Sequence, residues 1–302
     1  MDKAHKQTDK QLEKIERRLT KIYEDADFEL SASWRDYMKK VEKKSAKLLK
    51  AIDEATDDES RAKAEKEYQQ FLRNSTLRDK HYAQMVEETA VQLYNVNETA
   101  VAYINGQLPE TYALNLNWQN QQIASQVKGY SYTLVDKATV KYLATTNKSL
   151  LPFKKLNEAK DVRWNTKKIN SEVLQGILQG ESVPKIAKRL QKVQDMNTNA
   201  SIRTARTMIT SAENKGRMDS YKRAEASGIV LQKEWLSSDQ PGRTRDWHLP
   251  HSFESLVVDI DKPFVNGMGK IMYPGDPSAD GANVYNCRCT LGAKVVGFKK
   301  VR

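Results

Sequence analysis

The sequence predicts an α+β protein, in which elongated, mainly helical N-terminal and middle regions precede a small α+β C-terminal unit. Three observations lead to this prediction. Residues 1–105 contain neither glycine nor proline, and the first of each are Gly106 and Pro109. Apolar residues recur at spacings of three and four over much of the chain before Gly228, as expected of helices with one buried face. After Gly228 come short β-like runs, separated by proline- and glycine-rich connections.

The N-terminal region, residues 1–106, is predicted to be a helical hairpin or bundle. The acidic cluster 56–59 favours a break and a restart, because carboxylates stabilise helix N-termini. A further helix is expected over about 76–104. Apolar stripes of this kind form either a core or a contact surface for a partner helix. The stripes are Leu12, Ile15, Leu19 and Ile22, followed by Trp34, Met38, Val41, Ser45, Leu48 and Ile52.

The middle region, residues 107–228, is expected to begin with an asparagine- and glutamine-rich, broken stretch over 107–165. Helical periodicity returns at Trp164 and should end at Gly180. A second helix should start at 181–184 and run through Val193, and a third should cover about 198–226.

The formal net charge of +11 is concentrated in the middle of the chain. Residues 111–230 hold 20 basic and 9 acidic residues, whereas the flanking parts have net charges of only −2 and +2. A local excess of this kind favours a polyanionic partner, with double-stranded DNA first and a membrane surface second. The alternative is a solvated basic helix face. No sequence-reading motif is found, so contact with DNA should be non-specific. The candidate DNA-binding residues are Lys185, Lys188, Arg189, Arg203, Arg206, Lys215, Arg217, Lys222 and Arg223.

The C-terminal unit, residues 229–302, is expected to contain strands over 229–236, 256–260 and 290–298. Its long loops, with a turn at 240–242, need an anchor. The chain has two cysteines, too few for a disulfide framework. Two thiolates and two imidazoles suit tetrahedral zinc, so the sequence predicts one structural zinc as a candidate cofactor. The alternative is a pair of reduced core cysteines beside a hydrogen-bonded histidine. The four candidate ligands are His248, His251, Cys287 and Cys289.

An enzymatic role is the second interpretation of these residues. A cysteine and a histidine could act as nucleophile and base, with Asp246 or Asp276 orienting the imidazole. A nuclease metal site could be assembled from acidic residues, although most acidic loop residues form turns. No glycine-rich phosphate loop is found. The protein is therefore expected to act by binding and not by catalysis. The carboxylates available for such a site are Asp239, Asp246, Asp259, Asp261, Asp276 and Asp280.

The segment from about 164 to 296 resembles the phage Mu F-like minor head protein family, also called phage head morphogenesis proteins. The resemblance rests on a glycine-containing helix, a Ser-Val-Pro-x-Ile-Ala helix start at 182–187 and an ordered set of single residues. Two departures are Met208, where many relatives have an acidic residue, and the stretch 249–253 after the family histidine. The motif residues are Arg206, Thr207, Asn214, Trp235, Arg245, His248, Pro274, Asp276, Asn286, Cys287, Arg288 and Cys289.

The resemblance implies a protein of the virion interior that takes part in procapsid assembly near the portal. Its implied partners are the portal protein, other procapsid components and packaged double-stranded DNA, with which some members leave the head on ejection. The sequence shows no run of about eighteen apolar residues and no secretory signal, so no membrane span is expected. During assembly the protein is expected in the host cytoplasm.

Overall fold

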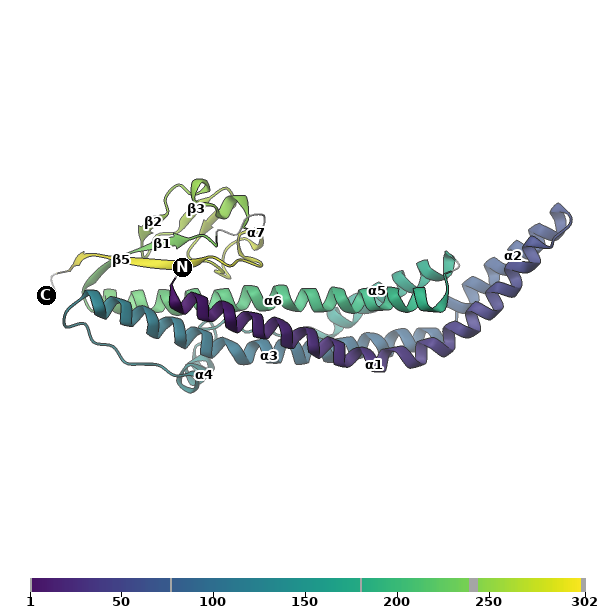
Figure 1. Cartoon of the computed structure of the whole chain (residues 1–302), viewed down its shortest axis with the longest axis horizontal. Coiled ribbons are helices and arrows are strands. Elements are labelled where there is room, and N and C mark those ends of the chain that lie inside the picture. The colour runs from purple at the N-terminus through teal and green to yellow at the C-terminus, as the bar shows by residue number, and fades with distance from the viewer. Residues whose placement is uncertain (1, 77, 180, 239–243, 300–302) are drawn as a thin grey trace. The chain divides into compact units, whose positions relative to one another are not determined.

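A computed structural model of the chain describes residues 2–76, 78–179, 181–238 and 244–299 (Figure 1). The helices are α1 (Lys3–Asp53), α2 (Asp58–Thr76), α3 (Lys80–Gln126), α4 (Lys137–Thr146), α5 (Glu158–Leu178), α6 (Val183–Ala226) and α7 (Gly281–Val284). Two 3-10 turns are η1 (Asp246–His248) and η2 (Pro250–Ser252). The strands are β1 (Ile229–Leu236), β2 (Val257–Asp259), β3 (Phe264–Asn266), β4 (Gly269–Ile271) and β5 (Thr290–Phe298).

These elements confirm the predicted α+β class, because the long helices lie before residue 229 and the strands of the described residues begin at or after it. The predicted break at 56–59 is also confirmed, since α1 ends at Asp53 and α2 begins at Asp58. The predicted helix end at Gly180 and the predicted turn at 240–242 lie outside the described residues. Among the helices of the described ranges, none has the length and apolar character required to cross a membrane.

The helix predicted over 76–104 continues much further than expected. α3 passes through Gly106 and Pro109 and ends at Gln126, so the predicted broken stretch is wrong for residues 107–126. Leu108, Tyr112 and Leu116 are at most 2% exposed, which shows that this part of α3 carries a buried apolar face. Burial of that face outweighs the poor intrinsic helix propensity of glycine, proline and asparagine.

The break predicted between Val193 and Thr198 is also wrong, because α6 runs through it without interruption. Two polar residues of this stretch are buried and form hydrogen bonds. Gln194 donates to the backbone carbonyl of Tyr23. The Asn197 side chain donates to the Val193 carbonyl at 2.9 Å and to the Asn165 side chain at 3.0 Å. Buried amides with satisfied hydrogen bonds remain compatible with a helix interior.

Packing divides the chain into two compact units, each assembled from segments that are distant in the sequence. The strand-bearing unit comprises residues 1–18, 101–154 and 202–302, and the helical unit comprises residues 19–100 and 155–201. Each of the helices α1, α3 and α6 contributes to both units. The division cuts across the three predicted sequence regions 1–106, 107–228 and 229–302.

The second apolar stripe of the N-terminal region forms part of the core of the helical unit. Trp34, Met38 and Val41 are 2–8% exposed and pack with apolar residues of α2, α3, α5 and α6. The Trp34 ring lies edge-on to Tyr82, with ring centroids 5.9 Å apart, and its Nε1 donates to Thr89 at 2.9 Å. These positions of the stripe are therefore occupied by the chain's own side chains.

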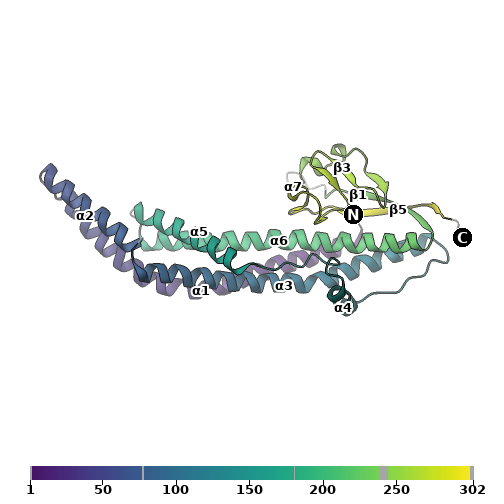
Figure 2. The same cartoon turned by 180° about the vertical axis from the view of Figure 1, so that it is seen from behind.

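The strand-bearing unit contains a three-stranded antiparallel sheet of order β2-β1-β5 and a separate β3-β4 hairpin. The strands predicted over 229–236 and 290–298 are confirmed, and β2 lies within the predicted 256–260. The β3-β4 hairpin was not predicted, because three-residue strands are too short to show an alternating pattern. Both views show the sheet beside the C-terminal half of α6 (Figures 1 and 2). That helix therefore faces the segment that carries the two cysteines.

Candidate functional site

One face of α6 is bonded along the backbone of the cysteine-containing segment. The Asn286 amide donates to the Thr207 hydroxyl at 2.9 Å, and the Thr210 hydroxyl donates to the Cys287 carbonyl at 2.7 Å. The Asn214 side chain donates to the Cys289 carbonyl at 3.3 Å and accepts from the Leu291 amide at 2.9 Å. The helical residues are three or four positions apart, which places them on one helix face. The seven-residue spacing from Thr207 to Asn214 thus places two turns of α6 along the segment 286–291, which leads into β5.

The Tyr-Pro-Gly-Asp-Pro motif forms a turn that packs directly on α6. Gly275 has a φ of +81°, and a Cβ built there would lie 2.7 Å from the Ser211 backbone nitrogen. Only glycine fits both the backbone conformation and the available space. The buried Asp276 carboxylate accepts from the amides of Met272 and Ser278 at 3.1 and 2.9 Å. Asp276 is therefore a turn-forming residue and does not contact the His248 imidazole.

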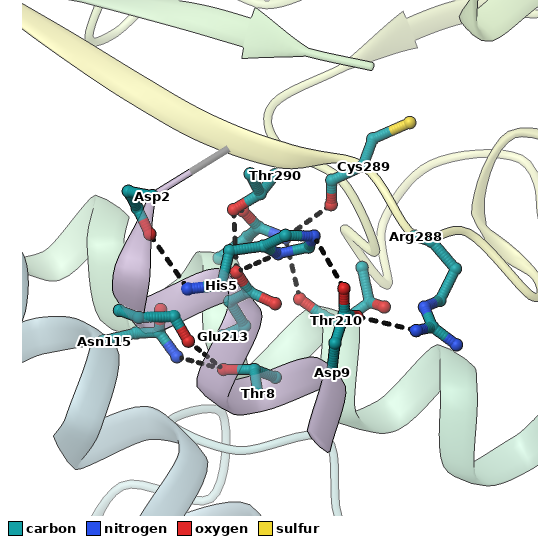
Figure 3. A network of polar contacts seen from close by, with 12 residues as sticks. Asp2, His5, Thr8, Asp9, Asn115, Thr210, Glu213, Arg288, Cys289 and Thr290 are labelled. Atoms are coloured by element: carbon teal, nitrogen blue, oxygen red, sulfur yellow. Dashed lines mark hydrogen bonds and ion pairs between the residues drawn. The ribbon is translucent and has the colours of Figure 1, made fainter. Parts of the chain in front are cut away.

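A buried charge network joins the start of α1 to α6 and β5 within the strand-bearing unit (Figure 3). Glu213 Oε1 lies 2.8 Å from His5 Nδ1 and 3.2 Å from an Arg217 nitrogen, and it accepts from the Thr290 hydroxyl at 2.8 Å. Arg217 is fully buried and also donates to both carboxylate oxygens of Asp2, at 2.6 and 2.9 Å. The network therefore closes without a lone buried charge.

The pKa values of this network follow from its pairing. Burial alone would raise the pKa of Glu213, but the His5 and Arg217 charges outweigh burial and leave it lowered. Burial alone would lower the pKa of His5, but the Glu213 carboxylate outweighs burial and leaves it raised. Both groups are therefore stabilised in their charged forms.

Two family-motif arginines extend the same network toward solvent. Arg206 forms a two-point pair with Glu16, with nitrogen–oxygen distances of 2.7 and 2.9 Å. Arg288 donates to Asp9 at 2.7 Å. Both pairs connect the N-terminal part of α1 to motif positions of the same unit, so these arginines fasten that helix to the motif.

The side chains of His248, Cys287 and Cys289 lie close together, just before the start of β5. His248 Nδ1 lies 3.4 Å from Cys287 Sγ and 3.8 Å from Cys289 Sγ. All three residues are at most 4% exposed. The ring of Trp235 packs edge-on against the His248 ring, with centroids 5.2 Å apart. In the described residues this is the one group of three or more histidine, cysteine or acidic side chains arranged closely enough to hold a metal ion.

An asparagine pair determines which imidazole nitrogen faces the sulfur atoms with a lone pair. Asn266 Oδ1 accepts from the Met268 amide and its Nδ2 donates to the Trp247 carbonyl, both at 2.9 Å, so its orientation is set by the backbone. Asn283 must then donate to Asn266 Oδ1 and accept at its own Oδ1. That Oδ1 lies 3.0 Å from His248 Nε2, which is therefore the protonated nitrogen. In the neutral ring, Nδ1 presents its lone pair to the two sulfurs.

The two thiols do not titrate alike. A hydrogen bond from the Cys289 thiol holds the pKa of Cys287 well below its usual range. The Cys287 sulfur and burial raise the pKa of Cys289 well above its usual range. The Cys287 sulfur therefore carries the first negative charge of the pair.

A cavity of about 350 Å³ adjoins this cluster. Three arginines contribute to its wall, Arg206, Arg245 and Arg288, and Asn286 lies among them. Arg245 donates to the Ala282 carbonyl at 2.9 Å. His248, Cys287 and Cys289 line the same cavity. The arginine side chains make it suited to oxygen-bearing anionic groups.

The structure brings together three of the four predicted metal ligands. His251 is exposed on η2 and is not part of the close group, because the turn that carries it directs it elsewhere. The predicted orienting residues Asp246 and Asp276 are replaced in that role by Asn283, which sequence reasoning missed because nothing in its spacing links it to His248. The remaining carboxylates do not gather: Asp280 caps α7, Asp259 accepts from Gln232, and Asp261 lies 3.9 Å from Lys262. Asp239 lies outside the described residues.

The candidate DNA-binding residues differ in their surroundings. Arg217 is buried in the charge network. Arg189 pairs with Glu181 at 2.6 Å, Arg206 pairs with Glu16, and Lys215 pairs with Asp219 at 2.8 Å. The exposed members of the set are Lys185, Lys188, Arg203, Lys222 and Arg223.

Known proteins show similarity to part of the chain. The family described as Phage Mu protein F like protein matches residues 167–292. Minor head protein GP7 of Bacillus phage SPP1 is 30% identical over 124 residues, which are 39% of this chain and 37% of that protein. NAD(+)--arginine ADP-ribosyltransferase EFV of Enterococcus faecalis (strain ATCC 700802 / V583) is 26% identical over 134 residues, which are 43% of this chain and 26% of that protein. No solved structure matches the chain.

The chain thus spans between a quarter and two fifths of the length of these relatives. The matched range includes the residues of α6 that bond the cysteine segment, the turn at Gly275, His248 and both cysteines. The resemblance stated from the motif residues is confirmed, because the family described as Phage Mu protein F like protein matches residues 167–292 and a minor head protein is similar to part of the chain.

Proposed function

We propose that this chain is a minor head protein of a tailed bacteriophage, located in the virion interior and assembled with other procapsid components in the host cytoplasm. The observation that carries the proposal is the family match over residues 167–292, joined by the similarity to a protein named as a minor head protein. The proposed partners are the portal protein and packaged double-stranded DNA.

The geometry of the motif supports a structural role. Thr207, Thr210 and Asn214 direct their polar atoms to the backbone of the segment 286–291, and Gly275 lets a turn approach α6. These residues therefore build and fasten the strand-bearing unit. A building block of the head requires this kind of fixed local structure.

DNA contact is proposed through the exposed basic residues of α6. Lys222 and Arg223 lie near its C-terminal end, and Arg203 lies further back along the helix. Lysine and arginine side chains neutralise phosphates without reading bases, which suits DNA of arbitrary sequence. Arg217 is excluded from direct contact with DNA in this conformation, because it is buried and bonded on all sides.

The buried positions of the two N-terminal apolar stripes are not available for contact with the portal protein. Leu12, Ile15 and Leu19 are at most 1% exposed, and Trp34 and Met38 are buried in the helical unit. Residues 1–18 also belong to the strand-bearing unit, so deleting the N-terminal helix would remove its charge network. We therefore base the test on the full chain and not on a truncation.

The test uses heads assembled with an affinity-tagged full chain. Mass spectrometry of procapsids and of heads before and after DNA release should detect the chain in few copies, and cross-linking should join it to the portal protein. Tagged chain that folds and accumulates but never enters procapsids would refute the head assignment. Incorporation without portal cross-links would refute the portal contact alone.

The second candidate function is a virion-associated thiol hydrolase, favoured by the order Cys287–His248–Asn283. A thiol facing an imidazole that is held by an asparagine side chain is an arrangement found in thiol hydrolases. Against it, Cys287 is 4% exposed and a second sulfur lies on the same imidazole nitrogen. Turnover of ester and peptide substrates tests this function. A hydrolase needs only the Cys287 thiol, so a Cys289→Ser variant should retain turnover. A head protein that only binds should show no turnover. A metal-dependent nuclease lacks support, because the described carboxylates do not gather.

A further inference from the structure

The cluster of His248, Cys287 and Cys289 has the features of a metal centre. We propose that these three side chains bind one zinc ion, and that its fourth coordination position opens to the arginine-lined cavity and takes water or an anionic oxygen ligand. The proposal differs from the set read from the sequence, because His251 is not a ligand. It does not depend on the proposed function in the phage head.

The separations between the candidate ligand atoms match a tetrahedral zinc ion. With zinc–sulfur distances of about 2.3 Å and zinc–nitrogen distances of about 2.0–2.1 Å, tetrahedral angles place a sulfur and a nitrogen ligand about 3.6 Å apart. The observed distances from His248 Nδ1 are 3.4 Å to Cys287 Sγ and 3.8 Å to Cys289 Sγ. The three ligand atoms lie within 4.8 Å of one another. Zinc can therefore enter with small side-chain adjustments.

The imidazole is already held in the form that binds zinc. Asn283, fixed through Asn266 to the backbone, accepts a hydrogen bond from Nε2, which leaves the Nδ1 lone pair directed at the two sulfurs. Zinc-binding histidines almost always donate their other nitrogen to an oxygen acceptor in this way. A packing role for His248 would not require a donor–acceptor relay that ends on two backbone groups.

The charge of the proposed centre suits its burial. Zinc binds both cysteines as thiolates, so each thiol that is still protonated loses its proton to solvent as its zinc–sulfur bond forms. One Zn²⁺ with two thiolates and a neutral imidazole has no net charge. The neutral complex avoids the large cost of leaving a lone charge among groups that are at most 4% exposed. No oxidant or reductant is needed, because zinc does not change its oxidation state.

The surroundings leave room for a fourth ligand that is not a protein side chain. Among the described residues the close group contains only three ligand side chains, and all three line the cavity of about 350 Å³. Arg206, Arg245 and Arg288 line the same cavity. A zinc ion with three protein ligands and one open position binds water or an oxygen anion there. Positive guanidinium groups favour the anion.

The first experiment measures zinc in the full chain, purified after growth with zinc and without chelators. Elemental analysis should find one zinc per chain. Cys287→Ser, Cys289→Ser and His248→Ala should each lose most of it, whereas the matched control His251→Ala should retain it. Zinc-free wild-type protein, or equal zinc in all four variants, would overturn the site. Loss of zinc from His251→Ala would overturn the three-ligand assignment.

Variants of a buried cluster can fail to fold, so two further measurements use chains that keep all three ligands. Chelation of wild-type protein should lower its melting temperature, and added zinc should restore it. Asn283→Ala should weaken zinc binding by about 10–100-fold, because the imidazole loses its acceptor. Asn95→Ala, an exposed control on α3, should leave zinc binding unchanged. Equal zinc affinity in the Asn283 and Asn95 variants would contradict the proposed orientation of His248.

The second experiment tests the open position. Wild-type protein is reconstituted with Co²⁺, whose visible spectrum reports thiolate ligation and coordination number, and is titrated with inorganic phosphate. A saturable spectral change, reduced in Arg245→Gln, supports an anion on the metal. Thiolate bands that do not respond to phosphate would overturn the open position and indicate a closed structural site.

Discussion

The Thr210 hydroxyl on α6 donates a 2.7 Å hydrogen bond to the backbone carbonyl of Cys287. The two residues are 77 positions apart in the sequence. One helical turn later, Asn214 forms hydrogen bonds with the backbone of Cys289 and Leu291. The helix α6 therefore holds the cysteine segment along its length. The positions of both sulfurs therefore depend on a polar helix face, and the stability of the unit should respond to changes on that face.

Replacing Asn214 should loosen this attachment. Asn214→Ala removes the side-chain partner of both the Cys289 carbonyl and the Leu291 amide, which are buried and would be left without these hydrogen bonds. Unsatisfied buried groups cost about 1–3 kcal/mol each, so the free energy of unfolding should fall by about 2–4 kcal/mol. Urea denaturation measures the change. The control is Asn95→Ala, at an exposed position of α3, which should not lower the free energy of unfolding. Equal decreases in both variants would show that the Asn214 hydrogen bonds contribute nothing to stability.

Three glycines of the C-terminal unit separate backbone strain from steric contact. Gly267→Ala should change the unfolding free energy by less than about 0.5 kcal/mol, since Gly267 has open space and no positive φ. Gly269→Ala keeps the open space but must adopt a φ of +99°, which should cost about 1 kcal/mol. Gly275→Ala adds a clash with Ser211 and should cost more than about 2 kcal/mol. Thermal denaturation of the three variants should preserve this order, and a Gly275→Ala protein as stable as Gly267→Ala would contradict the turn packing.

Breaking the buried charge network should be among the most destabilising single changes in the chain. Arg217→Met leaves His5 as the one cationic partner of Glu213 among the described residues, and it removes both bonds to Asp2. Removing one member of a buried pair costs about 3–5 kcal/mol. The matched control is Arg223→Met, nearly two turns further along α6 and exposed, which should stay within about 0.5 kcal/mol of the parent. Chemical denaturation of both proteins tests the difference, and similar stabilities would mean that Arg217 is not a required partner.

The same network should make stability depend on pH. His5 faces Glu213 and Arg217 of α6 and Asp9 of α1, and its pKa is raised from 6.5. A raised folded-state pKa contributes stability that is fully present below 6.5 and lost as the pH rises through the folded value. The lowered pKa of Glu213 has the opposite sign, so its contribution is lost at acid pH below its usual value of 4.5.

The urea concentration at the unfolding midpoint should therefore decrease as the pH rises above 6.5, and His5→Gln should flatten this part of the profile. His81→Gln, on the exposed first turn of α3, is the control and should keep the parent profile. A parent protein with no alkaline loss of stability, or a His5→Gln protein that keeps it, would contradict the assignment to His5.

DNA binding should be sequence-independent and should depend on the exposed end of α6. The double variant Lys222→Gln/Arg223→Gln should flatten the plot of log affinity against log salt by about 0.9 for each duplex phosphate that the variant no longer neutralises. The control Lys63→Gln/Lys66→Gln removes the same charge from exposed positions of α2, in the part of the chain with a negative balance. Fluorescence anisotropy with two duplexes of unrelated sequence measures both. Equal effects of the two variants would show that net charge, and not α6, governs binding.

Much of this protein follows from local patterns in its sequence. The absence of glycine and proline before Gly106 and the spacing of apolar residues predict long helices, and the short runs after Gly228 predict the strands at 229–236 and 290–298. These features depend on neighbours within a few residues, so the local sequence pattern is enough to predict them. The ordered motif likewise predicts the family, because its residues and spacings can be read without a structure.

Other features exist only where distant segments meet. α3 continues past Pro109 and α6 continues past Asn197 because packing supplies favourable contacts that outweigh local propensity. The close group of two cysteines and one histidine contains His248 and not His251, because the short turns bury one imidazole and expose the other, and no spacing rule reports that difference. Arg217 is basic, as a residue that contacts DNA would be, but it is buried like a core residue. Burial and pairing of charges are properties of three-dimensional contacts, and only the tertiary structure decides them.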